Sequence, residues 1–531
     1  MIEDAAIKLI VWDLDDTLWR GTLADGDTPE LFAERGEMIR AFNRRGVLSS
    51  ICSKNDFDIA RAKLEELGLW DEFVFPCIAF EPKPQAIAAI IEDMQLRAAN
   101  VLFVDDNPVN LHEVSYCLPG IHVLDSARPD SDARLAALLE RQTGTRSRLP
   151  EYRMLERKKR DRAGLATVSN EDFLHSCDIK ACAPSMSANL DFAGRIAELI
   201  NRSNQLNYTC SRVTEEELER DIVDIISYYC WSIFAWDRYG DYGLVGFVMV
   251  DRRNLRFRHF TFSCRAMHMG LEQYALDTVR RSYPELFALL DLSDLEGRFS
   301  RAVPDWISDQ SYDDAGVRGA LVARHVPNLE AADLRIMCDC QSGGLAHYSR
   351  WRARIDFDNA PRVFRLRMFL DNDYAGQDFP ACLVYGPGID YLDVRWPDNG
   401  RWLDGPIYRL LVERMCAFLE ARGIRALIIL SPEDSPPSHY GRCEGQTRER
   451  IRQFNAIWRE VALHCEALTL LEVAEVCSPD EMIDSNHHHP GSLRKLAGWI
   501  DDWYEQVSQR APASHDVMIE RRGSAYASLA L

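Results

Sequence analysis

The chain has 531 residues, which is too long for one hydrophobic core and predicts roughly three to four domains. Hydrophobic residues make up 47% of the sequence and charged residues 27%, which is typical of globular proteins and excludes wholesale disorder. The formal net charge of −21 disfavours binding to nucleic acid or to anionic membranes. We therefore expect any phosphorylated substrate to be held by local cations or by a metal ion.

The N-terminus and the cysteines indicate the cellular compartment. The opening "MIEDAAIKLI" lacks a basic stretch followed by a long apolar one, and no later window reaches the roughly 18 apolar residues of a membrane span. The 15 cysteines form no C-x-x-C pairs, which favours reduced and mostly buried thiols. We expect a cytoplasmic protein that contacts no membrane.

Residues 1–147 are predicted to form a Rossmann-like parallel α/β domain. Between residues 8 and 125, short apolar strands such as "LIVWDL" and "VLFVDD" alternate with helical stretches such as "DFDIARAKLEELGLW". The segment 148–182 contains a charged helical stretch at 150–163 and is interpreted as a connector.

The remaining sequence predicts two further domains and a tail. Residues 183–326 combine a helix near 188–205, strands in "CWSIFAWDR", "GLVGFVMVDR" and "LRFRHFTFSC", and a helix in "GLEQYALDTVRRSYPELF", so this domain is expected to be α+β. Residues 327–508 form another βα series, with strands in "DLRIMCDC", "FPACLVYG" and "IRALIIL" and long helices between them. Residues 509–531 are interpreted as a loose tail.

The segment "VWDLDDTLW" places carboxylates directly after the first apolar strand. Ligands of parallel sheets bind beyond the carboxyl ends of the strands, where Asp13, Asp15 and Thr17 fall. One carboxylate there can attack phosphorus, a second can act as general acid and base, and the threonine hydroxyl can hold a phosphate oxygen. Such crowding of negative charge predicts a shared divalent cation.

Three later segments supply side chains to the same edge of the predicted sheet. Ser53 lies in "ICSKN", Lys83 in "FEPKP", and Asp105 with Asp106 in "VLFVDDNPVN". Mg²⁺ prefers hard oxygen ligands, so we expect it as the cofactor. The predicted metal ligands are Asp13, Asp15, Asp105 and Asp106.

The order of these motifs resembles the haloacid dehalogenase superfamily of phosphotransferases over residues 8 to about 125. The resemblance implies that Asp13 is the nucleophile and Asp15 the general acid and base. It also implies that Ser53 and Lys83 hold the phosphate, with Asp105 and Asp106 completing the magnesium site. The alternative is that each aspartate only caps a strand or helix, but four segments in one order disfavour that interpretation.

The middle domain extends the resemblance. "RIAELINRSNQLNYT" and "FSCRAMHMGLE", together with "WDLDDTLWRG" and "VDDNPVN", resemble the FkbH-like family, in which a phosphatase domain of subfamily IIIC is fused to an acetyltransferase-like domain. Those enzymes take 1,3-bisphosphoglycerate, remove its phosphates and load the glyceryl unit through a cysteine onto an acyl-carrier protein. Cys264 matches that cysteine, Arg265 the following arginine and Glu272 a glutamate. The sequence departs from the family at His268-Met269, where Gly-Arg is expected.

The chemistry of Cys264 also follows from its neighbours. A thiolate that attacks an acyl phosphate gives a thioester, and both Arg265 and a helix N-terminus near Gly270 would favour the thiolate. The alternative for Cys264 is a buried structural cysteine.

The last domain resembles SGNH-type hydrolases in two blocks, "IMCDCQSGG" and "DSNHHHPGSLRKLAGWI". Asp484 and His487 match the spacing of the last block. In the first block Cys340 occupies the position of the nucleophilic serine, and Ser342 follows two residues later. A cysteine or serine with a histidine base would form an acyl-transfer site. The alternative is that the three histidines form a surface loop or an adventitious metal site.

Taken together, these patterns predict a Mg²⁺-dependent phosphatase and acyltransferase. The resemblance implies that an acyl phosphate is dephosphorylated and that its acyl group passes through Cys264 to an acyl-carrier or peptidyl-carrier protein in polyketide or nonribosomal biosynthesis. The alternative is a plain small-molecule phosphatase whose later domains dock a carrier protein. No nucleic-acid partner is expected.

Overall fold

The computed structural model describes residues 6–23, 29–164, 168–203, 205–299, 302–357, 366–371, 378–393, 396–433, 447–483 and 487–508. Residue contacts divide the chain into two compact units. The first comprises residues 1–178 and 236–242, and the second comprises 179–235 and 243–531. The second and third predicted domains therefore belong to one compact unit. None of the helices in the described ranges is long and apolar enough to span a bilayer.

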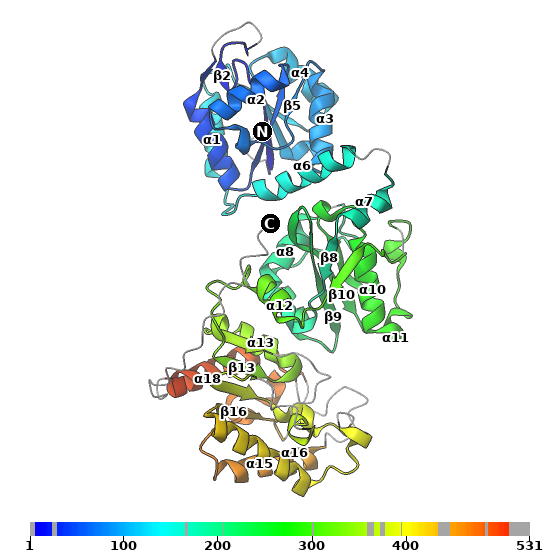
Figure 1. Ribbon diagram of the computed structural model, residues 1–531, viewed down its shortest axis with the longest axis vertical. Coiled ribbons are helices and arrows are strands. Elements are labelled where there is room, and N and C mark those ends of the chain that lie inside the picture. The colour runs from blue at the N-terminus through cyan, green and yellow to red at the C-terminus, as the bar shows by residue number, and fades with distance from the viewer. Residues whose placement is uncertain are drawn as a thin grey trace. The chain divides into compact units, whose positions relative to one another are not determined.

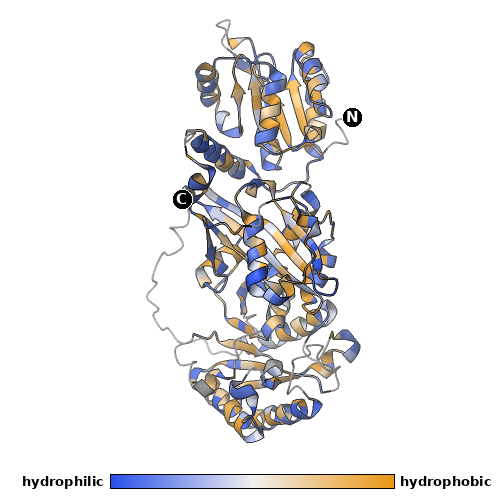
Figure 2. Cartoon of the chain, turned by 90° about the vertical axis from the view of Figure 1, so that its right-hand side faces the viewer, coloured by the Kyte–Doolittle hydropathy of each residue, from blue (hydrophilic) through white to orange (hydrophobic). Residues whose placement is uncertain are grey.

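The first unit contains a five-stranded sheet in the order β5-β4-β1-β6-β7, and all its strand pairs are parallel. This is the Rossmann-like parallel arrangement that the alternating pattern predicts. Its strands are hydrophobic along most of their length (Figure 2). The bounds are β1 Leu9–Trp12, β4 Leu48–Ser53, β5 Cys77–Ile78, β6 Val101–Asp105 and β7 His122–Asp125.

Helices cover both faces of this sheet (Figure 1). Because successive side chains of a strand point to opposite faces, Ile10 and Trp12 pack in one buried cluster with α1, α2 and α5, while Leu9 and Val11 pack in another with α3 and α4. A short antiparallel pair, β2 Trp19–Arg20 with β3 Glu30–Leu31, was not predicted. The helices are α1 Ala33–Arg44, α2 Phe57–Glu66, α3 Lys83–Asp93, α4 Pro108–Cys117, α5 Ser131–Glu140, α6 Leu149–Gly164 and α7 Asn170–Ser176.

The second sheet has the order β11-β10-β9-β8-β12. β10 and β11 pair antiparallel, whereas β8 and β12 pair parallel, as befits an α+β region. The strand Ile179–Cys182 belongs to this sheet, although the sequence pattern assigns it to the connector. The strands are β8 Ile179–Cys182, β9 Tyr228–Asp237, β10 Gly240–Asp251, β11 Arg256–Phe262 and β12 Ile307–Gln310.

Two helices of this region are shorter than predicted. The predicted helix at 188–205 begins instead as the 3-10 segment η5 Met186–Phe192 and becomes α-helical only in α8 Ala193–Arg202. The predicted helix at 270–287 breaks at Pro284, which cannot continue a helix interior. The remaining helices are α9 Glu215–Val223, α10 Leu271–Ser282, α11 Pro284–Phe287 and α12 Ala315–Val322.

The third sheet is fully parallel and has the order β14-β13-β15-β16-β17. Helices α15 and α16 cover one face, and α13 and α18 lie on the other (Figure 1). The edge strands β14 and β17 were not predicted. The strands are β13 Leu334–Met337, β14 Ile355–Phe357, β15 Cys382–Tyr385, β16 Arg425–Leu430 and β17 Leu468–Glu472. The helices are α13 Ser342–His347, α14 Met368–Asp371, α15 Gly405–Arg422, α16 Arg448–Ala462, α17 Val473–Val476 and α18 Pro490–Ser508.

Candidate active site

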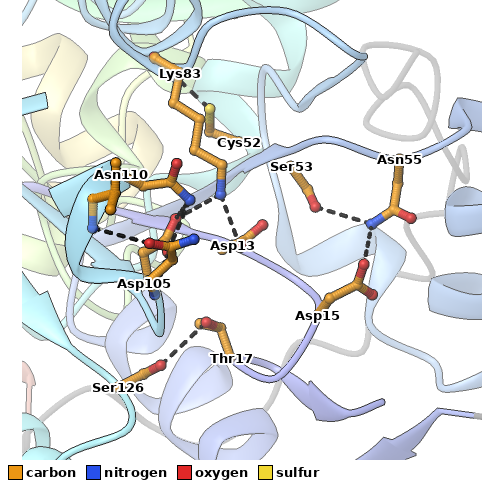
Figure 3. A network of polar contacts seen from close by, with 12 residues as sticks. Asp13, Asp15, Thr17, Cys52, Ser53, Asn55, Lys83, Asp105, Asn110 and Ser126 are labelled. Atoms are coloured by element: carbon orange, nitrogen blue, oxygen red, sulfur yellow. Dashed lines mark hydrogen bonds and ion pairs between the residues drawn. The ribbon is translucent and has the colours of Figure 1, made fainter. Parts of the chain in front are cut away.

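A buried charged cluster lies at the carboxyl ends of the central strands of the first sheet (Figure 3). Asp13 directly follows β1, Asp105 is the last residue of β6, and Lys83 is the first residue of α3. The Lys83 Nζ atom lies 2.8 Å from Asp13 Oδ2 and 2.5 Å from Asp105 Oδ2. Because β1 and β6 are neighbours in the parallel sheet, their ends bring the two carboxylates to one ammonium group.

Burial and neighbouring charges shift the pKa values of Asp13 and Lys83. Burial raises the pKa of Asp13 to about 6, although Lys83 and a hydrogen bond from Ser53 oppose this rise. Burial lowers the pKa of Lys83, but the charges of Asp13 and Asp105 outweigh that effect and raise it overall. Lys83 therefore stays an ammonium ion, and its charge limits the rise that burial causes in the pKa of Asp13.

Asp105 is held in a fixed orientation by its own loop. The backbone N–H of Asn107 donates to Asp105 Oδ1 at 2.8 Å, and the Asn110 side-chain amide lies 3.2 Å from both carboxylate oxygens. The neighbouring Asp106 has a raised pKa because of its partial burial and the charge of Asp105. Both aspartates thus present oxygens to the same space.

Three of the four predicted metal ligands come together. Carboxylate oxygens of Asp13, Asp105 and Asp106 all lie within 4.8 Å of one another. An all-oxygen donor set with several negative charges fits Mg²⁺, which would reduce the repulsion among the carboxylates that raises the pKa of Asp106. The residues present therefore fit the predicted cofactor, with these three side chains as its protein ligands.

The carboxylate of Asp15 lies outside that cluster. It accepts hydrogen bonds from Trp19 Nε1 at 2.8 Å and from Asn55 Nδ2 at 3.0 Å. Asn55 also donates to Ser53 Oγ at 3.1 Å, so this amide links the predicted acid/base to the predicted phosphate-binding serine (Figure 3). Asp15 is therefore not among the three carboxylates that lie together, and its predicted roles as a metal ligand and as general acid and base stay predictions.

The hydroxyl of Thr17 faces a partner that was not predicted. Thr17 Oγ1 lies 3.1 Å from Ser126 Oγ, and both residues are buried. The guanidinium of Arg35 donates to the backbone oxygens of Thr17 and Ser126, at 2.5 Å and 3.0 Å, and also pairs with Asp132 at 2.8 Å. Thr17 therefore helps to fix the loop after β1 to the loop after β7.

Sequence reasoning missed Asn55, Asn110 and Ser126. The two asparagines stand within quoted motifs, "ICSKN" and "VLFVDDNPVN", so their closeness to assigned residues was an available signal. Ser126 follows "IHVLD" without a distinguishing pattern, and only the topology places it beside Thr17.

Cys264 follows β11 and begins the 3-10 turn η6 Cys264–Ala266. Its side chain is half-buried, and the Arg265 Nε atom lies 3.3 Å from Ser263 Oγ. Gly270, which precedes α10, has a φ of +84°, a conformation that favours glycine. The predicted sequence of strand, cysteine turn and helix is therefore present in the structure.

Glu272, on the first turn of α10, is buried. Burial raises the pKa of its carboxyl group, and a hydrogen bond from Tyr208 opposes that rise.

In the third sheet region, Cys340 and His487 come together. The Cys340 Sγ atom lies 3.2 Å from His487 Nε2, across 147 residues of sequence. Ser342 is fully buried, and its hydroxyl accepts a hydrogen bond from the Cys338 backbone N–H at 2.7 Å. The fourth predicted residue of this site, Asp484, lies outside the described residues.

Comparison with known proteins identifies the class of the first domain. Residues 20–111 match the family of haloacid dehalogenase-like hydrolases. No curated protein matches the chain. The first unit therefore contains a haloacid dehalogenase-like hydrolase domain, as the motifs predict.

Several solved structures resemble part of the chain. The N-terminal part of a Bacteroides fragilis protein, which contains a phosphatase domain complexed with Mg, is 22% identical with a TM-score of 0.24; the match covers 28% of this chain and 42% of that one. The cobalt-bound deoxy-D-mannose-octulosonate 8-phosphate phosphatase of Haemophilus influenzae is 18% identical with a TM-score of 0.21, covering 27% of this chain and 91% of that one. A probable phosphatase of the same kind from Pseudomonas syringae is 20% identical with a TM-score of 0.21, over 27% and 89% of the two chains.

Proposed function

We propose that the first domain is a Mg²⁺-dependent phosphatase that works through an aspartyl-phosphate on Asp13. The observation that carries this proposal is the cluster in which Lys83 contacts both Asp13 and Asp105, with Asp106 nearby. The carboxyl group of Asp13, with a pKa of about 6, is mostly ionised at neutral pH and can act as a nucleophile toward a phosphoryl group held by Lys83 and a metal ion.

The reaction divides into two displacements at phosphorus. A carboxylate oxygen of Asp13 attacks the phosphoryl group, the bond from phosphorus to the leaving oxygen breaks, and Asp15 gives a proton to that oxygen where the leaving group needs one. Asp15 then takes a proton from water, whose oxygen attacks phosphorus and frees Asp13 and inorganic phosphate. Mg²⁺ would neutralise the charge that builds on the phosphoryl oxygens.

Single substitutions test the nucleophile. Asp13→Asn keeps the shape of the side chain and removes its nucleophilicity, so release of phosphate from acetyl phosphate with Mg²⁺ should fall at least about 10³-fold. The matched control is Asp16→Asn, since Asp16 is exposed, accepts a hydrogen bond from the Gly21 backbone at 2.9 Å and has a φ of +48° that asparagine tolerates. Phosphate release by Asp13→Asn at the wild-type rate would overturn the proposed mechanism.

We further propose that Cys264 accepts the acyl group of an acyl phosphate such as 1,3-bisphosphoglycerate. The thiolate attacks the acyl carbon, the carbon–oxygen bond to phosphate breaks, and a thioester forms without another energy source. The thiol of an acyl-carrier or peptidyl-carrier protein then takes the acyl group by exchange. The position of a half-buried thiol between a strand end and a glycine-capped helix supports this role.

Mass spectrometry of the intact chain after incubation with an acyl phosphate tests the second step. We expect an acyl adduct on the peptide that contains Cys264, and Cys264→Ser should lose it while phosphate release at the first domain continues. Cys210→Ser is the control, because Cys210 is a more exposed cysteine of the same region. Retention of the adduct in Cys264→Ser would show that the acyl group is carried elsewhere and would leave the phosphatase proposal standing.

A further inference from the structure

The third sheet presents a cysteine in a tight turn beyond the carboxyl end of β13. The strand ends at Met337, and the 3-10 turn η8 Asp339–Gln341 follows. Asp339 has a φ of +50°, a left-handed conformation that non-glycine residues adopt infrequently. Cys340 is the next residue of this turn, and it is half-buried, so part of the residue is open to solvent.

Two adjacent contacts join this turn to the loop that precedes α18. Cys340 Sγ lies 3.2 Å from His487 Nε2, and the backbone N–H of the next histidine, His488, donates to Gln341 Oε1 at 3.2 Å. A backbone hydrogen bond also holds His487, because the Ile483 N–H donates to the His487 carbonyl at 2.7 Å. The thiol and the imidazole are thus held by neighbouring residues of both segments.

The helices that follow the two segments also pack together. α13 starts two residues after Cys340, and α18 starts three residues after His487. A Cβ atom added to Gly344 on α13 would come within 2.9 Å of Leu493 Cδ1 on α18, so glycine permits this close approach. His487 itself is only 3% exposed, which excludes bulk water from most of the ring. The two segments that carry the pair are therefore followed by helices that pack against each other.

Ser342, the other candidate nucleophile, is buried and hydrogen-bonded. Ser342 is 0% exposed, and its oxygen accepts a hydrogen bond from the Cys338 backbone N–H at 2.7 Å. Ser342 is the first residue of α13, and its side chain binds the backbone at the start of the same turn. Between the two candidates, only Cys340 combines access from solvent with a neighbouring imidazole.

We propose that Cys340 and His487 form a second nucleophilic centre, which takes an acyl group from an acyl thioester. His487 Nε2 accepts the thiol proton, Cys340 sulfur bonds to the acyl carbon, and the bond from that carbon to the leaving sulfur breaks. The imidazolium then gives its proton to the leaving thiolate. Exchange of one thioester for another is close to balanced in energy, so the acyl group can pass onward to an incoming thiol. This proposal does not rest on the phosphatase activity or on Cys264.

The acetyl thioester of N-acetylcysteamine tests the pair in the full-length chain. After brief incubation at pH 6.5, peptide mapping should find Cys340 acetylated at least about 10-fold faster than the exposed Cys117, which serves as an internal reference for uncatalysed exchange. Acetylation of Cys340 no faster than that of Cys117, or found only on other cysteines, would overturn the proposal.

Substitution of the histidine separates base catalysis from packing. His487→Gln should lower the acetylation rate of Cys340 by about 10²-fold at pH 6.5, which is the lower range for a general base. At pH 9.5 the acetylation rates of Cys340 in His487→Gln and in wild type should be equal, because hydroxide removes the thiol proton without a general base. His489→Gln, at the exposed end of the same histidine triplet, should match wild type. An equal rate in His487→Gln at pH 6.5, or a deficit that persists at pH 9.5, would contradict the role of His487 as the base.

Discussion

The first and third sheets place reactive side chains at equivalent positions but solve opposite electrostatic problems. In both, a reactive side chain follows the carboxyl end of a parallel strand, Asp13 after β1 and Cys340 after β13, where α/β folds bind ligands. At the first sheet, Asp13 and Asp105 are buried charges held by Lys83. At the third sheet, Cys340 and His487 are a thiol and an imidazole that need no counter-charge for burial.

The difference shows that topology offers a place for chemistry and that local charge decides which chemistry is suited to it. Crowded carboxylates favour phosphoryl transfer, because a phosphate and a divalent cation together balance their charge. A thiol beside an imidazole favours acyl transfer, because the proton can pass between the two groups without a metal ion. The two sites should therefore respond differently to metal, charge and pH.

Removal of divalent metal should have the largest effect and should separate the two sites. Excess chelator should reduce phosphate release from acetyl phosphate by at least about 10³-fold, since the carboxylates lose the cation that stabilises the transition state. Added Mg²⁺ should restore it. Acetylation of Cys340 in the same samples should not change. Full phosphatase activity in chelator would contradict the metal site. If chelator slowed the acetylation of Cys340 as well, the two sites would not differ in their need for metal, and the comparison would fail.

Loss of the shared ammonium group should be the next largest effect. Lys83→Met leaves Asp13 and Asp105 buried without a counter-charge, so phosphate release should fall by about 10²–10³-fold. The free energy of unfolding of the first unit should fall by about 3–5 kcal/mol. Hydrogen exchange in peptides from β1 and β6 at rising urea concentration measures the second quantity.

Lys159→Met is the control for that experiment, because Lys159 is 56% exposed in its ion pair with Asp93. Lys159→Met should leave the rate of phosphate release unchanged and should change the free energy of unfolding by no more than about 0.5 kcal/mol. A Lys83→Met variant as stable as this control would show that the buried pairs are not needed for folding.

The raised pKa of Asp13 predicts a pH dependence of stability with a definite sign. Its pKa is about 6 in the folded state and 3.8 ordinarily, so the folded state holds the proton more tightly. The stabilisation is present at low pH and is lost as the pH rises from about 4 to 6. Between these limits wild type should lose roughly 2–3 kcal/mol relative to Asp13→Asn, measured without metal by hydrogen exchange in β1 peptides. Asp16→Asn should track wild type, and a constant difference between wild type and Asp13→Asn would contradict this account.

A pH effect of similar size is predicted for His347 in the second unit. His347, on α13, has Nε2 3.4 Å from Glu219 and Nδ1 3.9 Å from Asp191. Burial lowers the pKa of His347, but the two carboxylates outweigh it and raise the pKa to about 9. The stabilisation is therefore complete below pH 6.5 and is lost as the pH rises through 9.

Calorimetric unfolding at pH 6 and pH 9 measures this effect. The second unit of wild type should lose roughly 2–3 kcal/mol more than His347→Gln over that range. His464→Gln, an exposed histidine, should behave as wild type. If His347→Gln shows the same pH dependence as wild type, the two ion pairs do not stabilise the contact of α13 with α9 and η5.

The sequence predicted the first site better than the third because its signals are local. Asp13, Lys83 and Asp105 each stand directly beside a hydrophobic strand or a helix start, so alternation and charge together reveal them. Asn55 and Ser126 were missed because a single amide or hydroxyl in a loop carries no periodic signal. Their roles depend on which loops the sheet brings together, and that is a property of strand order.

The third site required the fold. Cys340 and His487 are 147 residues apart; the resemblance puts Cys340 at the nucleophile position, but only the structure shows that Cys340 contacts the histidine while Ser342 is hydrogen-bonded to the Cys338 backbone. The hydrogen bond from the Cys338 N–H to the Ser342 hydroxyl depends on the local fold at the start of α13, which the sequence pattern does not reveal. The edge strands β14 and β17 were also missed.

Trapping of the covalent intermediate tests the central claim most directly. Wild-type protein should be mixed with Mg²⁺ and ³²P-labelled acetyl phosphate, quenched in acid within the first turnover, and digested for peptide mapping. The account predicts label on the peptide that contains Asp13, label that persists in Asp16→Asn and none in Asp13→Asn. A phosphoryl group on any other peptide, or phosphate release by Asp13→Asn at the wild-type rate, would contradict it.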